Sequence, residues 1–201
     1  MSKPLRIVCI SGTSRPDNYT SRALAVVADE LRASGATAEV FDARDLTLAF
    51  PGQPPTPDAR RLKEAVASAA GIVLATPEYH GSFSAMTKLI IENLGFPSEL
   101  KGKPIALLGV AAGRIGAIKS IEHLRGVCAH VGGLVVPDAI SIAGVQAAFG
   151  ADGQPVDKGT DAALRGLAHS LLEYLAHYVC PKYVLEAAVR DGHVEPWVSP
   201  V

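Results

Sequence analysis

The chain has 201 residues, 48% of them hydrophobic and 19% charged, with 19 basic and 20 acidic side chains for a net charge of −1. This length and composition fit one globular domain, so residues 1–201 are expected to form a single domain. A near-neutral chain has no strong field of one sign, which disfavours partners such as nucleic acid or an anionic membrane.

Short hydrophobic strands alternate with amphipathic helices along the first half of the chain. LRIVCI at residues 5–10 predicts a strand, and the apolar spacing in residues 18–33 predicts a helix. A second strand is expected at 38–41 and a second helix at 58–70. GIVLAT at 71–76 lacks polar alternation, which is typical of a strand buried on both faces.

The same alternation continues to about residue 178. The expected elements are a helix at 83–94, a strand at 105–110, a helix at 115–131, a strand at 133–136 and a helix at about 161–178. Beyond residue 181 no regular period predicts an element. Five strands alternating with five helices indicate an α/β fold, an open parallel sheet with helices on both faces.

The sequence also disfavours a membrane protein, a secreted protein and a metal-binding protein. The longest apolar stretches, such as 105–113, are about half the roughly 20 residues that a membrane helix requires. The first residues lack the basic flank and long apolar region of a secretory signal, so a cytoplasmic location is predicted. The cysteines, at positions 9, 128 and 180, are too far apart for a CxxC site, and no histidine pair has the i, i+4 spacing of a helical metal site. We therefore predict no metal site.

Ligands of an open parallel sheet bind beyond the carboxyl ends of its strands. We therefore expect the binding site in the loops after the first, third and fourth strands. The first loop, Ser11–Leu24, combines glycine, hydroxyl side chains, asparagine and arginine before a helix. Amide groups at a helix N-terminus with hydroxyls and a cation suit a phosphomonoester. The alternative is an ordinary helix cap, and Asp17 counts against an anion unless its carboxylate points away.

The other two loops suit a flat ring. The loop after the third strand presents PEYHGS at Pro77–Ser82, where a planar ring can stack on Tyr79; the alternative is a turn that caps the next helix. The loop after the fourth strand, Val110–Ala117, has only small residues besides Ile115 and Arg114, which permits a close approach of backbone to a ligand. Tight packing between the strand and the following helix explains these small residues equally well.

These three loops resemble those of the flavodoxin-like NAD(P)H-dependent FMN reductases, a family that includes quinone, azo-dye and chromate reductases. The matching text is GTSRPDNYT at Gly12–Thr20, PEYHGS at Pro77–Ser82 and AAGRIG at Ala111–Gly116, within a resemblance that covers Leu5–Val136. It implies a flavodoxin-like three-layer sandwich with a five-stranded parallel sheet in the order 2-1-3-4-5. PEYxGS at this place is specific, whereas the other two motifs are supporting.

The resemblance also implies that the cofactor is FMN and indicates which residues hold it. It implies no catalytic side chain. The residues implied around the phosphate are Thr13, Ser14, Arg15, Asn18, Tyr19 and Thr20; those around the flavin ring are Pro77, Glu78, Tyr79, His80, Gly81, Ser82, Ala111, Ala112, Gly113 and Arg114. Arg114 is explained equally well as an exposed ion pair. His80 and Thr20 depart from the family, which has asparagine at the first position and often at the second, so hydrogen bonds there are expected to differ.

By the same resemblance, NADPH or NADH gives hydride to FMN, which reduces a small-molecule acceptor. The sequence has no second nucleotide-binding motif, so nicotinamide and acceptor are expected to exchange at one site in a ping-pong cycle. The acceptor is a free flavin, a quinone, an azo compound or a metal oxyanion. The family further implies a homodimer or homotetramer. Phe83, Met86, Leu89 and Ile90 are candidates for its interface, or they pack on the sheet, and the tail at 192–200 either reaches a partner or folds back.

Two other functions remain open from the sequence. A flavodoxin-type electron carrier has the same fold but uses no NAD(P)H; such carriers tend to be strongly acidic and to have a TGxT element, whereas this chain is near neutral and has SRPDNYT at 14–20. A flavin-free domain that binds a phosphosugar or a nucleotide is the third candidate. An acyl-transfer hydrolase is disfavoured because no GxSxG turn follows a strand.

Overall fold

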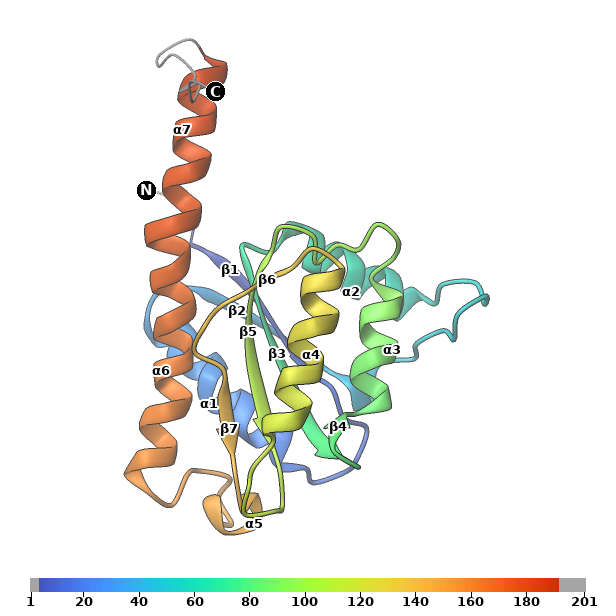
Figure 1. Ribbon diagram of the computed structural model, residues 1–201, viewed down its shortest axis with the longest axis vertical. Coiled ribbons are helices and arrows are strands. Elements are labelled where there is room, and N and C mark those ends of the chain that lie inside the picture. Colours follow the sequence, from blue (N-terminus) through green and yellow to red (C-terminus); the bar gives the residue numbers. More distant parts are fainter. Residues whose placement is uncertain (1–3, 192–201) are drawn as a thin grey trace.

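A parallel β-sheet forms the centre of the protein, whose computed structural model describes residues 4–191 (Figure 1). Its main strands are β1 (Arg6–Ser11), β2 (Thr37–Asp42), β3 (Gly71–Tyr79), β5 (Pro104–Val110) and β6 (Leu134–Val135). They lie in the order β2-β1-β3-β5-β6, all parallel to their neighbours. The strand order 2-1-3-4-5 is therefore confirmed.

Two short strands that the sequence does not predict bring the sheet to seven. β4 (Ser82–Phe83) folds back antiparallel on the end of β3. β7 (Ile140–Ile142) pairs with the last residues of β5, after β6 has paired with its first two. The predicted fifth strand, 133–136, thus corresponds to β6, and β7 lies beyond its bounds. Pro137, which lies between them, has no amide hydrogen to continue the ladder.

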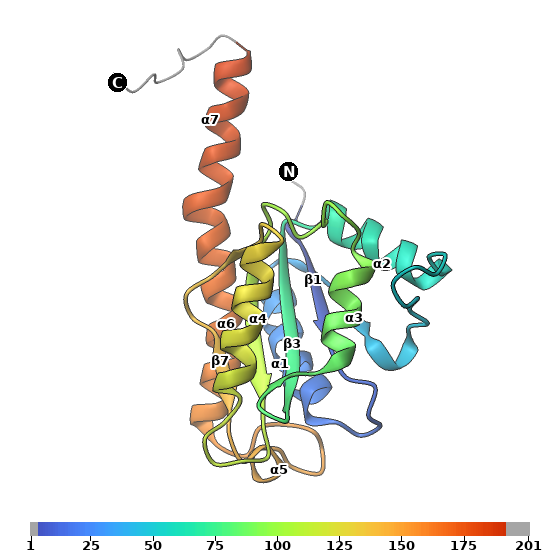
Figure 2. The same cartoon turned by 45° about the vertical axis from the view of Figure 1, so that its right-hand side comes forward.

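Helices cover both faces of the sheet because successive strand residues point to opposite sides. Ile7 and Cys9 of β1 belong to one buried cluster, together with residues of α1 (Tyr19–Ala33) and α6 (Lys158–Tyr174). Val8 and Ile10 belong to the other cluster, under α2 (Pro57–Ser68), α3 (Ala85–Asn93) and α4 (Ile118–His130). Figure 2 shows the sheet between these two helical layers.

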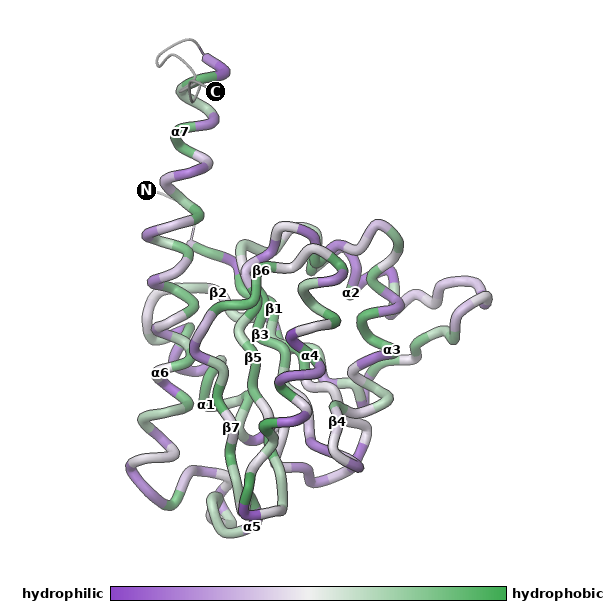
Figure 3. Tube along the Cα trace, in the orientation of Figure 1, coloured by the Kyte–Doolittle hydropathy of each residue, from purple (hydrophilic) through white to green (hydrophobic). Residues whose placement is uncertain are grey.

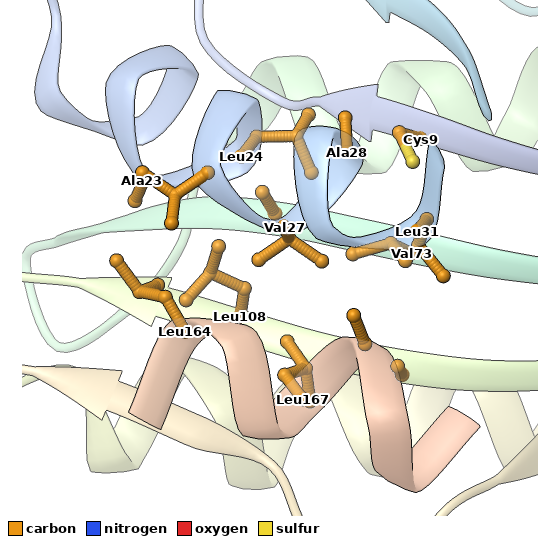
Figure 4. Close-up of a cluster of buried hydrophobic side chains, with 14 of the residues drawn as sticks. Cys9, Ala23, Leu24, Val27, Ala28, Leu31, Val73, Leu108, Leu164 and Leu167 are labelled. Carbon is orange, nitrogen blue, oxygen red and sulfur yellow. The ribbon is translucent and has the colours of Figure 1, made fainter. Parts of the chain in front are cut away.

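The cluster on the α1 and α6 side shows how sequence periodicity becomes packing. Leu24, Val27 and Leu31 recur at helical spacing and point from α1 toward the strands (Figure 4). Leu164 and Leu167 of α6 meet them, and all five side chains are fully buried. The apolar residues correspondingly concentrate along the central strands (Figure 3).

Capping side chains determine where most of these helices begin. Asn18, Thr56, Ser84 and Asp157 each accept a hydrogen bond from the first turn of α1, α2, α3 and α6, respectively. α2 also has a proline at its first position, where no amide hydrogen is needed. Shorter elements, η1 (Ala43–Asp45) and α5 (Val145–Ala148), occupy the loops after β2 and β7.

The four interface candidates on the segment around α3 contact their own domain to different degrees. Ile90 is completely buried, and Phe83 and Met86 pack partly against the cluster under α3 and α4. Leu89 is half-buried. Packing on the sheet accounts for Ile90 and for part of the surfaces of Phe83 and Met86.

The expectation of no element beyond residue 181 is wrong. After α6, a π-helical turn, η2 (Leu175–Val179), leads without a break into α7 (Cys180–Arg190). Pro181 lies in the first turn of α7, a place where its missing amide hydrogen is tolerated. The proline therefore permits the helix to continue. The tail at 192–200 lies outside the described residues.

Residues 4–191 contain neither a membrane-spanning helix nor a cluster of metal-ligating side chains. No helix in that range is long and apolar enough to cross a membrane. No group of three or more histidine, cysteine, aspartate or glutamate side chains in the same range is arranged to hold a metal ion.

Burial is expected to make two of the three cysteines unreactive. It raises the pKa of Cys9 and of Cys128 to about 12, so the thiolate fraction at pH 8 is on the order of 10⁻⁴. Cys180 is only half-buried. A disulfide reagent at pH 8 should titrate at most one thiol per chain in the native protein and three in denaturant. Fast reaction of three thiols without denaturant would contradict the buried positions.

Candidate functional site

A cavity of about 430 Å³ opens at the carboxyl edge of the sheet, between the loops that follow β1, β3 and β5. This size is within the range that small-molecule and cofactor sites occupy. Its lining consists of Arg15, Pro16, Asp17, Asn18, Tyr19, Thr20, Pro77, Glu78, Tyr79, Val110, Ala111, Ala112, Val145 and Gln146. The three loops therefore meet at one site, as expected for the edge where parallel strands end.

The loop after β1 is held by a buried hydrogen-bond network. The Gly12 amide donates to the carbonyl of Ala75 at 2.8 Å, which continues the ladder between β1 and β3. The Gly12 carbonyl accepts from the hydroxyls of Ser84 and Thr87, the latter at 3.2 Å. The Thr87 hydroxyl shares its single hydrogen between this carbonyl and the Thr76 hydroxyl, which lies 3.0 Å away. The start of the loop is thus fixed to the elements that carry the other wall of the cavity.

The N-terminus of α1 presents amide groups to the cavity. The Asn18 side chain accepts from the Ser21 amide at 2.7 Å and donates to the Arg15 carbonyl at 2.9 Å, which shapes the loop. The hydrogen bonds found among residues 4–191 include no acceptor for the amides of Tyr19 and Thr20. Two amides at the positive end of a helix are suited to an anion.

A carboxylate below this loop is held charged by its neighbours. Ser21 donates to Asp42 at 2.7 Å, and the guanidinium of Arg44 donates to both carboxylate oxygens, at 3.0 and 2.8 Å. Burial by itself raises the pKa of Asp42, but the hydrogen bonds from Arg44 and Ser21 outweigh it and keep the pKa below its usual value. Asp42 is therefore ionised at neutral pH and forms an ion pair with Arg44.

Asp17 lines the cavity, contrary to the requirement that its carboxylate lie away from a bound anion. Its backbone is left-handed, with φ of 46°. Asp42, and to a smaller extent Asp45 and Asp17, raise the pKa of Arg44, so the Asp17 charge is felt by a cation below the loop.

Tyr79 forms the aromatic wall of the cavity. Its hydroxyl lies 3.4 Å from that of Thr13, and the guanidinium carbon of Arg15 lies 5.8 Å from the centre of its ring. Tyr79 is half-buried, so part of the ring stays open to a ligand. Thr13 is buried and accepts from the Arg15 amide at 3.3 Å. The loop after β1 and the aromatic ring are therefore in direct contact.

His80 and Gly81 form the turn between β3 and β4. Both have left-handed backbones, with φ of 51° and 74°, and Tyr79 pairs with Ser82 across them. A two-residue hairpin with two positive φ angles favours Asn-Gly, and histidine is among the few other residues that adopt this conformation readily. The asparagine of the resembled family is thus explained by the turn, and His80 meets the same requirement.

Glu78 contacts a helix rather than a neighbouring side chain of the cavity. One of its carboxylate oxygens accepts from the Ser120 amide at 3.1 Å, in the first turn of α4. The residue before α4, Ala117, provides no side-chain cap. The charge of Glu78 satisfies this helix end and is attracted to its dipole. Glu78 therefore holds the Pro77–Tyr79 wall against α4.

Removing this carboxylate is expected to loosen the wall. Glu78→Ala should lower the free energy of unfolding by about 1 kcal/mol, the usual cost of losing a helix cap. Glu78→Gln keeps an oxygen acceptor and should recover more than half of that loss. Urea unfolding followed by circular dichroism measures both variants. Equal losses in the two would show that the hydrogen bond to α4 is not what Glu78 contributes.

The loop after β5 is fixed by the segment that follows β7. The Ala111 amide donates to the Ile142 carbonyl at 2.9 Å, and the Val145 amide donates to the Ala111 carbonyl at 3.0 Å. These bonds bring Val145 and Gln146 of α5 into the lining. No spacing or motif in the sequence points to them, because only the pairing of β7 with β5 brings them there.

The sixteen residues that the sequence proposes as cofactor ligands divide into three groups. Nine line the cavity: Arg15, Asn18, Tyr19, Thr20, Pro77, Glu78, Tyr79, Ala111 and Ala112. Thr13 lies buried behind the wall, in contact with Tyr79. Six belong to the same loops but are not part of the lining: Ser14, His80, Gly81, Ser82, Gly113 and Arg114. The lining residues that were missed are Pro16, Asp17, Val110, Val145 and Gln146.

Comparisons with known proteins identify relatives of this chain. Residues 5–147 match the protein family described as NADPH-dependent FMN reductase. An NAD(P)H-dependent FMN reductase of Pseudomonas aeruginosa is 33% identical over 169 residues, 78% of this chain and 88% of that protein. An NADPH azoreductase of a Bacillus species is 29% identical over 87% of this chain and 93% of its own length.

Solved structures show the same fold. The flavoenzyme FerB of Paracoccus denitrificans, an NAD(P)H:(acceptor) oxidoreductase, superposes with a TM-score of 0.70 at 23% identity over 86% of this chain and 97% of that chain. A second, the apo form of the NADH:FMN oxidoreductase EMOB, has a TM-score of 0.69 at 19% identity over 84% and 89% of the two chains.

Proposed function

The chain belongs to the NADPH-dependent FMN reductase family, and from this membership we propose that it passes electrons from a nicotinamide through FMN in the cavity described above to a small-molecule acceptor. It is an oxidoreductase, and its cofactors are FMN and NAD(P)H. One observation carries the proposal for the site: two amides at the N-terminus of α1 and the ring of Tyr79 border the same cavity.

The residues present fit FMN by their chemistry. The amides of Tyr19 and Thr20, with Arg15 beside them, are the donors that a phosphate monoester requires. Tyr79 offers a flat surface for a ring, and the small side chains of Ala111 and Ala112 let backbone approach its polar edge. When bound, FMN supplies the exchange of two electrons with nicotinamide and acceptor, which needs no side-chain nucleophile.

The chain's own residues then have three tasks. The first loop holds the phosphate, so that the position of the ring is set from one end. Tyr79 orients the ring, and Glu78 keeps the wall that carries Tyr79 fixed to α4. Backbone dipoles of the loop after β5 are available to negative charge that grows at the ring edge during reduction.

We further propose that nicotinamide and acceptor use the site in turn. A cavity of about 430 Å³ has room for one cofactor but not for two further bulky reactants beside it. Initial rates at several fixed acceptor concentrations should therefore give parallel double-reciprocal lines. Intersecting lines would indicate a ternary complex and would exclude the ping-pong cycle, although not the reductase activity itself.

The proposed function is tested first by measuring how much FMN the purified protein binds. Purified protein saturated with FMN should oxidise NADPH or NADH when a flavin, a quinone, an azo dye or a metal oxyanion is offered. A flavodoxin-type carrier would retain FMN but show essentially no nicotinamide oxidation. A protein that neither retains FMN through gel filtration nor quenches its fluorescence would exclude both. The cytoplasmic location and the homodimer or homotetramer stay predictions.

A further inference from the structure

Gln146 lines the cavity but holds neither the phosphate nor the ring in the site proposed above. It is the second residue of α5, and its side chain is exposed. The hydrogen bonds found among residues 4–191 include none to or from its amide group. A primary amide has both donors and an acceptor, so Gln146 brings an unoccupied neutral group to the cavity.

The backbone on both sides of Gln146 is fixed to other elements. Before it, the Val145 amide donates to the Ala111 carbonyl at 3.0 Å. After it, Phe149 is buried, and the centre of its ring lies 6.1 Å from that of Tyr19. Gln146 therefore belongs to a wall whose backbone is held from two directions.

Gln146 thus lies between the two ends of the proposed FMN site. Tyr19 begins α1, whose amides are the proposed phosphate donors, and Ala111 borders the proposed place of the ring edge. The part of FMN that joins its phosphate to its ring is the ribityl chain, a row of hydroxyl groups. We propose that the side-chain amide of Gln146 binds these ribityl hydroxyls, an inference that rests on the function proposed above.

A neutral amide suits this part of the ligand better than a charged group does. A hydroxyl both donates and accepts hydrogen bonds, as the amide does, so the two groups satisfy each other. Asp17 already brings a carboxylate to the lining, and a further negative charge would repel the phosphate. The amide of Asn18 is not available for this contact, because its oxygen and its nitrogen both have partners in the protein.

A flavin analogue tests this contact separately from the rest of the site. The analogue has the same ring and phosphate as FMN, but its connecting pentyl chain carries no hydroxyl group. Gln146→Ala should raise the dissociation constant of FMN about 5- to 10-fold, the usual effect of losing a neutral hydrogen bond. The dissociation constant of the analogue should stay within about twofold of its value for wild type, because the analogue has no hydroxyl to lose. Fluorescence titration measures both ligands.

Two further variants separate the hydrogen bond from the size of the side chain and from its segment. Gln146→Leu keeps most of the volume without the polar atoms, so it should weaken FMN binding as much as Gln146→Ala does. Gln154→Ala is the matched control, because Gln154 is exposed in the loop after α5 and is not part of the lining. It should bind FMN as wild type does. Both glutamines are exposed, so the urea unfolding curves of all three variants should match that of wild type.

Equal weakening of FMN and of the analogue by Gln146→Ala would show that the amide does not act on the ribityl hydroxyls, and it would overturn the proposal. Unchanged FMN affinity in both Gln146 variants would overturn it as well. In either case wild type would still bind FMN, and the proposed function would stand. A wild type that binds no flavin would instead remove the proposed function, and this inference with it.

Discussion

Gly12→Ala should be the most damaging single substitution at the site, with a loss of about 3 kcal/mol or more in the free energy of unfolding. The added methyl group would fall on the Thr87 hydroxyl and lie 3.0 Å from the Ala75 carbonyl oxygen. Overpacking of this kind costs about 1–3 kcal/mol. Displacing Thr87 leaves buried hydrogen-bonding groups unpaired, which costs about 1–3 kcal/mol more.

The same substitution should also weaken FMN binding. Because the Gly12 carbonyl accepts from Ser84 and Thr87, any shift of Gly12 moves the start of the loop that leads to Arg15 and Asn18. Urea unfolding gives the stability, and fluorescence quenching of added FMN gives the affinity. Gly166→Ala is the control: no atom lies within 4 Å of its new methyl group, and in the middle of α6 alanine should be neutral or stabilising. A Gly12→Ala protein as stable as wild type would contradict the packing described here.

Tyr79→Ala should weaken FMN binding by about 10- to 100-fold while leaving the fold intact. Stacking of a flat heterocycle on an aromatic side chain contributes about 1–3 kcal/mol, and a factor of ten in affinity corresponds to about 1.4 kcal/mol. Tyr79 is only half-buried, so its loss opens no cavity in either buried cluster.

Tyr79→Phe separates the ring from its hydroxyl. It keeps the ring and removes only the long hydrogen bond to Thr13, 3.4 Å between oxygens. We expect its FMN affinity to stay within about threefold of wild type, because such a long bond contributes little. Titration of FMN fluorescence measures both variants. Equal weakening by phenylalanine and alanine would assign the effect to the hydroxyl and would exclude stacking as the role of Tyr79.

Both predictions depend on one structural arrangement. The loop after β1 and the aromatic wall follow different strands, but Gly12, Thr76, Ser84 and Thr87 connect them beneath the cavity through buried hydrogen bonds. No buried side-chain nitrogen or oxygen in the described part of the chain lacks a partner. A fully satisfied network of this kind holds two loops at a fixed separation, which is what binding both ends of one ligand requires.

The layers of the fold and the edge at which the site lies could be predicted from local periodicity. An apolar run such as 71–76 needs two covered faces, and parallel strands bring their following loops to one edge. Other features of the site depend on contacts between segments that are distant in the chain. Val145 and Gln146 enter the cavity through a strand pairing distant in sequence, Glu78 acts on a helix 42 residues further on, and Pro181 permits α7 to continue. Periodicity records which face of an element is apolar, but not which distant segment comes to lie against it.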